Sequence, residues 1–372
     1  MKIGIIPLST KPLPSPNDSV FAPGNAINNL INGLINKKHT VTVFTGSESV
    51  CKGTIISGNL KTPWNTYGPP EKDLTAYTER RIEYDLIQSV EAIHEFTKKN
   101  NLDIINSHDF RINPYIFSLT TIPIIYTPHT NLSNNLSPYD LHRYKIIKKM
   151  NSGITALSKN NVLKAEEVNL PCFGYTPNGI DTTQFKPGRT HKSGVLIVNR
   201  IVPGKCIIEA LEGALLSKEK ITLIGPVGPK EEDKKYFSLI QKRFLHNPRI
   251  VYKGYLTPDK IIPYYQKARL LLYLSNSEGL PLGILEALAC ETPVIGSNVG
   301  GIPDIIEHGK NGYIIHNNKS KDEIYDAIQN IYLIHNQACR DKIEKEFSIS
   351  AMVDNYINAY SQFLTYRNRD KI

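Results

Sequence analysis

Short apolar runs rich in β-branched residues alternate with helical patterns along the whole chain. In the first half, this pattern predicts buried strands at residues 3–6, 41–44, 103–106, 122–126 and 154–157. In the second half, strands are expected at residues 195–198, 221–224, 250–253, 270–274, 293–295 and 312–315. One helical stripe is formed by Ile27, Leu30, Ile31, Leu34 and Ile35, and Thr257-Pro258 predicts the start of another helix. Alternation of this kind predicts an α/β protein with parallel sheets.

The length of the chain, 372 residues, corresponds to about two domains that each bury a sizeable core. A turn-rich stretch runs from Pro177 to Gly188 and contains the dipeptides Asn-Gly and Pro-Gly. Such stretches are typical of domain boundaries. Two α/β units in tandem, separated near this stretch, therefore account for the length.

The charge balance calls for an anionic partner. The chain has 44 basic and 35 acidic residues, a net charge of +9. A nucleic acid, a phosphorylated small molecule and an acidic membrane surface would each satisfy this excess. Zinc-finger spacing, an aromatic RNA-binding strand and a concentrated basic arm are all absent from the sequence, so we expect no nucleic-acid partner.

The common nucleotide-binding motifs are also missing. A lone glycine, Gly24, precedes the first predicted helix in place of GxGxxG, and no P-loop motif occurs. The sequence lacks an Asp-x-Asp motif that would hold a metal ion against a diphosphate. A bound diphosphate would therefore have to be neutralised by side chains and helix ends, without a metal ion.

The cysteines and the N-terminus bear on localisation. Five cysteines are scattered with no CxxC pair, which favours a reduced, cytoplasmic protein without a disulfide framework or zinc site. Pro7 interrupts the apolar run at the N-terminus, so a signal peptide is not expected.

The segment 275–296 carries the strongest functional signal. A predicted strand is followed by a small-residue turn from Gly279 to Gly283, an apolar helix and a further strand. The turn presents backbone N–H groups at a helix N-terminus, which favours an anion such as a diphosphate. Glu278 and Glu286 flank that position, where they can accept hydrogen bonds from a sugar and a ribose. Two isolated glutamates at this spacing are more often solvated, but their position between two buried strands favours a site.

Together with Thr292-Pro293-Val294-Ile295 and Gly300-Gly301-Ile302-Pro303-Asp304, this segment resembles the donor motif of retaining GT-B glycosyltransferases of the family-four type (glycosyl transferases group 1). The resemblance extends over nearly the whole chain. It implies two Rossmann-like α/β domains that face each other across a cleft. The acceptor-binding domain would comprise residues 1–187 and a returning last helix at about 353–372, and the donor-binding domain residues 188–352.

The resemblance also implies roles for individual residues. In similar enzymes, the positions of Arg200 and Lys205 clamp the donor diphosphate, and a histidine at the position of His129 lies beside the transferred sugar. With Glu278, these are the expected catalytic residues. The expected donor-binding residues are Gly24, Arg200, Lys205, Gly254, Tyr255, Glu278, Gly279, Leu280, Pro281, Leu282, Gly283 and Glu286. A catalytic and a structural role both remain open for His108, since the family's preceding histidine is Asn106 here.

The implied reaction is the transfer of a hexose, with retained anomeric configuration, from a nucleoside-diphosphate sugar to a hydroxyl of a glycan or glycolipid. A UDP-sugar is favoured over GDP-mannose as the donor, and no metal or cofactor is expected. A front-face path fits because the sequence offers no carboxylate pair for double displacement. The alternatives are a sugar-nucleotide epimerase on the GT-B fold and a non-catalytic sugar-nucleotide-binding protein.

A basic segment leaves membrane contact open. Arg143, Lys145, Lys148 and Lys149 share residues 141–150 with several apolar side chains. Such a segment could lie on the anionic inner face of a membrane, as a peripheral contact. A solvated helix that covers the sheet is an equally good interpretation.

Overall fold

The computed structural model describes residues 1–8, 11–16, 22–67, 74–87, 93–110, 114, 121–132, 137–188 and 191–369. The chain divides into two units, one of Met1–Gly179 with Ile349–Ile372 and one of Ile180–Ser348. The boundaries predicted at residues 187 and 353 are therefore both too late. Ile180 forms a β-bridge with Ser348 and donates its backbone N–H to the carbonyl of Phe347 at 2.9 Å, which ties both crossing points to the second unit.

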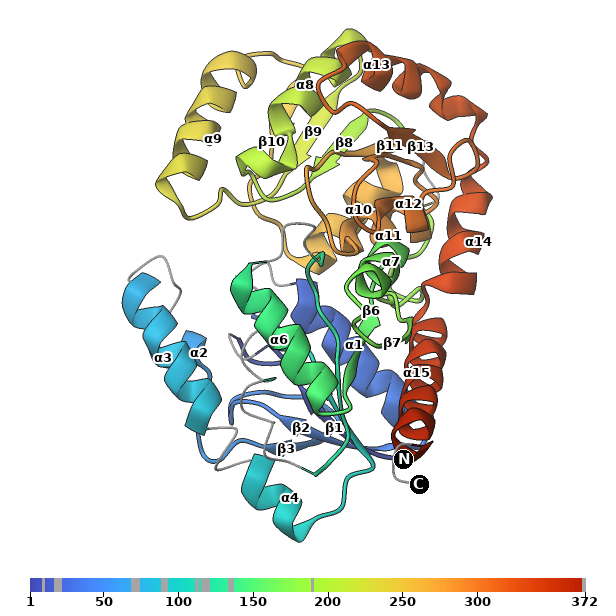
Figure 1. The fold of residues 1–372 in the computed structure, drawn as a ribbon. Helices are drawn as coiled ribbons and strands as arrows, with labels where there is room; N and C mark the ends of the chain where they lie inside the picture. The colour runs from blue at the N-terminus through green and yellow to red at the C-terminus, as the bar shows by residue number, and fades with distance from the viewer. Residues whose placement is uncertain are drawn as a thin grey trace. The chain divides into compact units, whose positions relative to one another are not determined.

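The described residues of the first unit form a seven-stranded sheet in the order β3-β2-β1-β4-β5-β6-β7 (Figure 1). All neighbouring strands pair in parallel. The strands are β1 (Lys2–Ile6), β2 (Thr40–Phe44), β3 (Thr54–Ile56), β4 (Ile104–Ser107), β5 (Ile124–Tyr126), β6 (Gly153–Ala156) and β7 (Cys172–Tyr175). The strand order reverses between β1 and β4, which marks a doubly wound sheet.

The second unit repeats this plan with a six-stranded parallel sheet in the order β10-β9-β8-β11-β12-β13. Its strands are β8 (Val195–Val198), β9 (Ile221–Ile224), β10 (Ile250–Tyr252), β11 (Leu270–Tyr273), β12 (Val294–Ser297) and β13 (Gly312–Ile315). Here the order reverses between β8 and β11. The structure thus has the expected α/β class with two parallel sheets.

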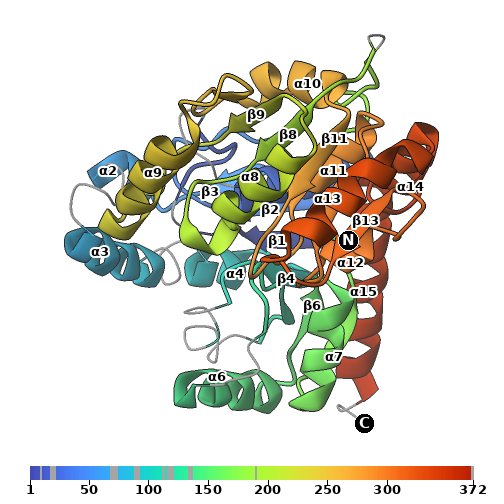
Figure 2. The same ribbon diagram turned by 90° about the horizontal axis from the view of Figure 1, so that it is seen from above.

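Helices connect the strands in both units. In the first unit they are α1 (Ala22–Asn36), α2 (Pro63–Tyr67), α3 (Leu74–Ile87), α4 (Glu95–Lys99), α6 (Pro138–Lys149), α7 (Lys159–Glu167) and α15 (Ile349–Arg369). In the second unit they are η3 (Pro203–Lys205), α8 (Ile207–Leu216), α9 (Glu231–Phe244), α10 (Pro258–Lys267), α11 (Leu282–Ala289), α12 (Ile302–Ile305), α13 (Lys321–Asn330), η4 (Ile331–Leu333) and α14 (Asn336–Glu346). Within that unit, α8 and α13 lie side by side (Figure 2).

The returning helix α15 completes the core of the first unit. It packs against α1 and β7, and its buried face includes Val353, Tyr356 and Phe363. Burial of each such side chain contributes about 1.5–3 kcal/mol. The approach to α1 is close, because a Cβ atom on Gly33 would lie 2.4 Å from the Val353 side chain. The aromatic stripe near the C-terminus therefore serves packing.

Candidate functional site

The reversal of strand order in the second sheet locates the candidate site. The chain leaves β8 and β11, which are neighbours, toward opposite sides of the sheet, and ligands of such sheets bind at the carboxyl ends of the two strands. Arg200 and Lys205 follow β8, whereas Ser275 and Glu278 follow β11. Residues that are 70 or more positions apart in the sequence therefore meet at the carboxyl-terminal ends of the strands, which form one edge of the sheet.

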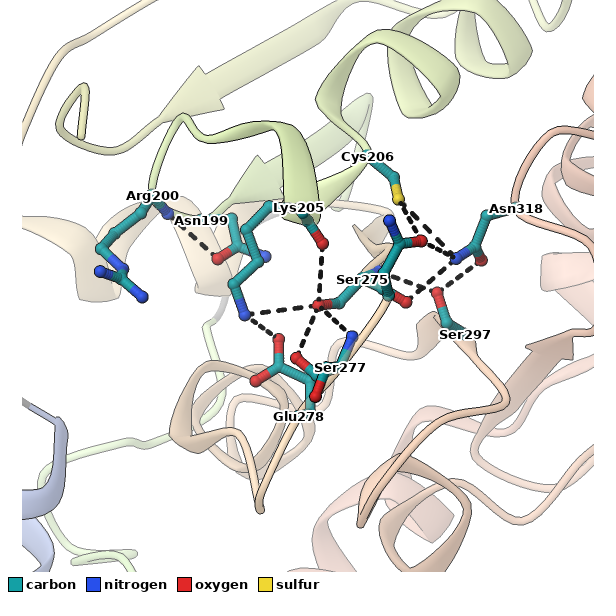
Figure 3. Close-up of polar contacts among 11 residues, drawn as sticks. Asn199, Arg200, Lys205, Cys206, Ser275, Ser277, Glu278, Ser297 and Asn318 are labelled. Atoms are coloured by element: carbon teal, nitrogen blue, oxygen red, sulfur yellow. Dashed lines mark hydrogen bonds and ion pairs between the residues drawn. The ribbon is translucent and has the colours of Figure 1, made fainter. Parts of the chain in front are cut away.

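Lys205 and Glu278 form an ion pair at this edge (Figure 3). Their side chains are only 13% and 11% exposed, and the Lys205 Nζ also lies 3.4 Å from the Ser275 Oγ. Because β11 ends at Tyr273, Glu278 lies in the loop that follows this strand. Because both side chains are largely shielded from water, the attraction between the two charges is stronger than on the surface, and neither charge is well solvated without the other.

Two residues that the sequence did not single out hold the Ser275 loop. Ser275 donates its backbone N–H to the Ser297 Oγ at 2.9 Å, and Ser297 donates to the Asn318 Oδ1 at 2.6 Å. Asn318 closes the ring by donating its Nδ2 to the Ser275 carbonyl at 3.0 Å (Figure 3). Ser297 ends β12 and Asn318 follows β13, so three successive strand ends are joined. The only sequence signal for Ser297 and Asn318 as site residues was that each is polar and lies just past a predicted strand.

Arg200 stands at the exposed side of the same edge. Its backbone N–H donates to the Asn199 Oδ1 at 3.0 Å, and its guanidinium makes no ion pair with the residues that the structure describes. The neighbouring strand β9 needs glycine at position 225, directly after its end, because a Cβ atom there would lie 1.7 Å from the Asn199 carbonyl oxygen. The backbone N–H of Gly225 in turn donates to the Gly254 carbonyl at 2.8 Å. Gly254, with Tyr255 next to it, thus belongs to the same row of strand ends.

Helix α11 directs its N-terminus toward this edge. The helix is capped by Pro281, whose side chain cannot accept a hydrogen bond, and its first turn has no acidic residue. The preceding turn is fixed because the Gly279 carbonyl accepts a hydrogen bond from the Gly301 N–H at 2.8 Å. Leu280 and Leu282 are buried beside Gly283. The first N–H groups of α11 therefore remain available to an anion.

Glu286 lies one turn inside α11 in an apolar setting. Tyr265, fully buried on α10, donates its hydroxyl to the Glu286 Oε2 at 2.9 Å. Burial raises the pKa of Glu286 to about 7, and the Tyr265 hydrogen bond limits this rise. Burial raises the pKa of Tyr265 well above its usual value, so this hydroxyl acts only as a donor to the carboxylate.

The first unit brings together two predicted residues of its own. Its strand order reverses between β1 and β4, and His108 and His129 follow the neighbouring strands β4 and β5. The His108 Nδ1 and the His129 Nε2 are 2.9 Å apart. Because β5 ends at Tyr126, His129 lies in the loop that follows this strand. Gly24 is buried within the first turn of α1, rather than before the helix.

Asn106 has a structural place in this unit. It is fully buried, donates to the Thr127 Oγ1 at 2.9 Å and accepts from the Tyr360 hydroxyl at 3.0 Å. This position, where the family often has a histidine, therefore anchors α15 to the sheet.

Neither a metal cluster nor a membrane span is found in the part of the chain that the structure describes. Three or more His, Cys, Asp or Glu side chains do not gather there as potential metal ligands. None of the described helices has the length and apolar character needed to cross a bilayer.

The amino-acid sequence is similar to one known protein family and to several known proteins. The family described as "Glycosyl transferases group 1" matches residues 180–346. N-acetyl-alpha-D-glucosaminyl L-malate synthase of Bacillus anthracis is 26% identical over 59% of this chain, which spans 63% of that protein's length. D-inositol 3-phosphate glycosyltransferase of an Arthrobacter species is 23% identical, with 86% of this chain and 84% of that protein aligned.

Solved structures match the whole fold. Sucrose-phosphate synthase of Thermosynechococcus elongatus superimposes with a TM-score of 0.74 at 16% identity, covering 98% of this chain and 99% of that one. HepE of Anabaena, solved in complex with UDP, gives a TM-score of 0.67 at 15% identity, covering 97% of this chain and 100% of its own. These matches agree with the resemblance drawn from the motifs: the chain has the GT-B fold, and its second unit matches the glycosyl transferases group 1 model over residues 180–346.

Proposed function

We propose that the protein transfers a hexose from a nucleoside-diphosphate sugar to an acceptor hydroxyl, with retention and without a metal ion. The observation that carries this proposal is the Lys205 ammonium, which is paired with Glu278 at the row of strand ends where Arg200 and the N-terminus of α11 also lie. Two side-chain cations and a helix end supply the positive potential that a diphosphate needs. UDP is the favoured nucleotide, and the UDP-bound and UDP-glucose-bound structures of Anabaena HepE support that choice.

The two glutamates suit the hydroxyls on either side of the diphosphate. We assign Glu278, at the loop after β11, to the transferred sugar, and Glu286, inside α11, to the ribose. Gly254 and Tyr255, at the end of β10, are assigned to the nucleobase. His129 of the first unit is assigned to the transferred sugar. These roles follow the family resemblance residue by residue.

The reaction proceeds on one face of the sugar. The bond between the anomeric carbon and the diphosphate oxygen breaks, and the acceptor oxygen bonds to the same face of that carbon. The released diphosphate oxygen takes the acceptor's proton. Lys205, Arg200 and the helix end stabilise the negative charge that develops on the leaving diphosphate, which is the main catalytic contribution of the protein.

Replacement of Lys205 tests the proposal. Lys205→Ala is expected to lower turnover of the nucleotide sugar by about 100-fold or more, because the leaving group loses a buried cation. Release of UDP from UDP-glucose, or from whichever nucleotide sugar the wild type consumes, is the measurement. Lys235→Ala removes an exposed lysine of α9 and should retain wild-type turnover. Near wild-type transfer by Lys205→Ala, with the fold intact, would overturn the assignment.

We further propose that the acceptor is lipid-linked and that α6 contacts an anionic membrane. Tyr139 and Leu141 on this helix are 77% and 45% exposed. Lys145, Lys148 and Lys149 are exposed as well, whereas Tyr144 and Ile147 are the buried residues of the helix. The acidic residue of α6, Asp140, is paired with Arg143 at 2.6 Å. A helix that exposes both apolar side chains and lysines suits an anionic bilayer surface.

Vesicle binding checks this contact. The wild type should co-sediment with vesicles that contain phosphatidylglycerol at low salt and should be released at high salt. Reversal of the three exposed lysines of α6 to glutamate should abolish binding. Reversal of Lys234, Lys235 and Lys242 on α9 is the matched control and should bind normally. An equal loss of vesicle binding in both triple variants, or vesicle binding that does not change with salt concentration, would contradict a specific contact by α6.

Glu286 predicts a pH dependence of stability. Its pKa of about 7 in the folded protein exceeds the ordinary value of 4.5, so the unfolded chain releases this proton first as pH rises. The group therefore lowers the free energy of unfolding progressively between about pH 4.5 and pH 7, and the loss is complete above pH 7. Glu286→Gln should match the wild type near pH 5 and exceed its stability near pH 8. Denaturant titrations at both values measure this, and parallel stability curves for the two proteins would disprove it.

A further inference from the structure

The histidine pair of the first unit carries information about proton positions. The His108 Nδ1 and the His129 Nε2 are 2.9 Å apart, and the two ring centroids are 5.1 Å apart. At this distance one nitrogen must donate a proton and the other must accept it. The bond therefore couples the tautomers of the two rings.

His108 is held from several sides. It is 2% exposed, and its backbone N–H donates to the Ile6 carbonyl at 2.8 Å. Its ring packs 6.3 Å from the Tyr356 ring of α15, centroid to centroid. The His108 Nε2 is buried and finds no hydrogen-bond partner among the described residues. The environment of this second nitrogen therefore decides between the two tautomer pairs.

The two arrangements differ in what they leave buried. If His129 donates from Nε2, the neutral His108 must carry its own proton on Nε2, where it would be a buried N–H without an acceptor. If His108 donates from Nδ1, its Nε2 is a bare lone pair. Among buried groups in proteins, an N–H without an acceptor is rarer than an acceptor without a donor. The second arrangement is therefore favoured.

We propose that His108 donates from Nδ1 to the His129 Nε2 and so fixes His129 as the tautomer that carries its proton on Nδ1. His108 is then a positioning residue. His129 offers an N–H donor to a sugar hydroxyl and has no free basic nitrogen. This consequence deepens the proposed function and rests on it, whereas the tautomer itself does not.

The electrostatics of the pair agree with two neutral rings. Burial lowers the pKa of His129 to about 4 and lowers that of His108 well below its usual value, with a smaller contribution from the neighbouring ring. Neither ring is expected to gain a proton near neutral pH, so the hydrogen bond joins two neutral imidazoles. A front-face reaction, in which the diphosphate takes the proton, needs no histidine base.

Nitrogen NMR of the histidine side chains tests the tautomer directly. The whole protein, labelled with ¹⁵N-histidine and free of donor, should show His129 with a protonated Nδ1 and a bare Nε2 near neutral pH. The His129 signals are assigned by their loss in His129→Gln. A protonated Nε2 on His129 would overturn the proposal, and because donor is absent this result does not depend on the proposed function.

A pair of variants tests the positioning role. His108→Phe keeps a ring beside Tyr356 but removes the donor. It should return His129 toward the tautomer protonated on Nε2, and it should lower turnover at least about tenfold with little change in donor KM. His108→Gln keeps a side-chain N–H and should restore part of both signals. His246→Phe, at an exposed position, should change neither. An unchanged His129 tautomer in folded His108→Phe would contradict the proposal, as would an equal loss of turnover in His108→Gln.

Discussion

Parallel pairing of the central strands is the constraint on which the candidate site depends. Parallel strands end at the same edge of their sheet, and the reversal of order between β8 and β11 turns the chain away on opposite sides there. A lysine after one strand and a glutamate after the other can then meet without any loop reaching across the unit. The first sheet uses the same rule to pair His108 with His129.

The site combines charge with partial burial, and this combination has a cost. The Lys205–Glu278 pair is kept largely from water, so loss of either partner would leave a poorly solvated charge. Glu286 sits in apolar surroundings that raise its pKa, a cost that a purely structural helix would avoid with a neutral residue. Retention of a carboxylate at such a position is understandable if it binds hydroxyl groups in the donor complex.

The sequence predicted elements well where burial is complete and poorly where it is not. The central strands of both sheets are continuous apolar runs, and each appeared near its predicted place. The edge strands β3 and β7 were missed because they are short and only partly buried. In β7, Gly174 also interrupts the apolar pattern of the sequence. The polar ring through Ser297 and Asn318 was also missed, since it depends on contacts between strand ends rather than on a local pattern.

Metal-free binding of a nucleoside diphosphate is the central claim, and calorimetric titration of UDP into the whole protein in the presence of EDTA tests it most directly. The account predicts saturable binding of one UDP per chain, with an affinity that does not rise when EDTA is replaced by Mg²⁺ and that Lys205→Ala weakens strongly. GDP and ADP titrated under the same conditions identify the nucleotide if UDP is not preferred. Failure of all three to bind in EDTA, or binding that appears only with Mg²⁺, would contradict the account.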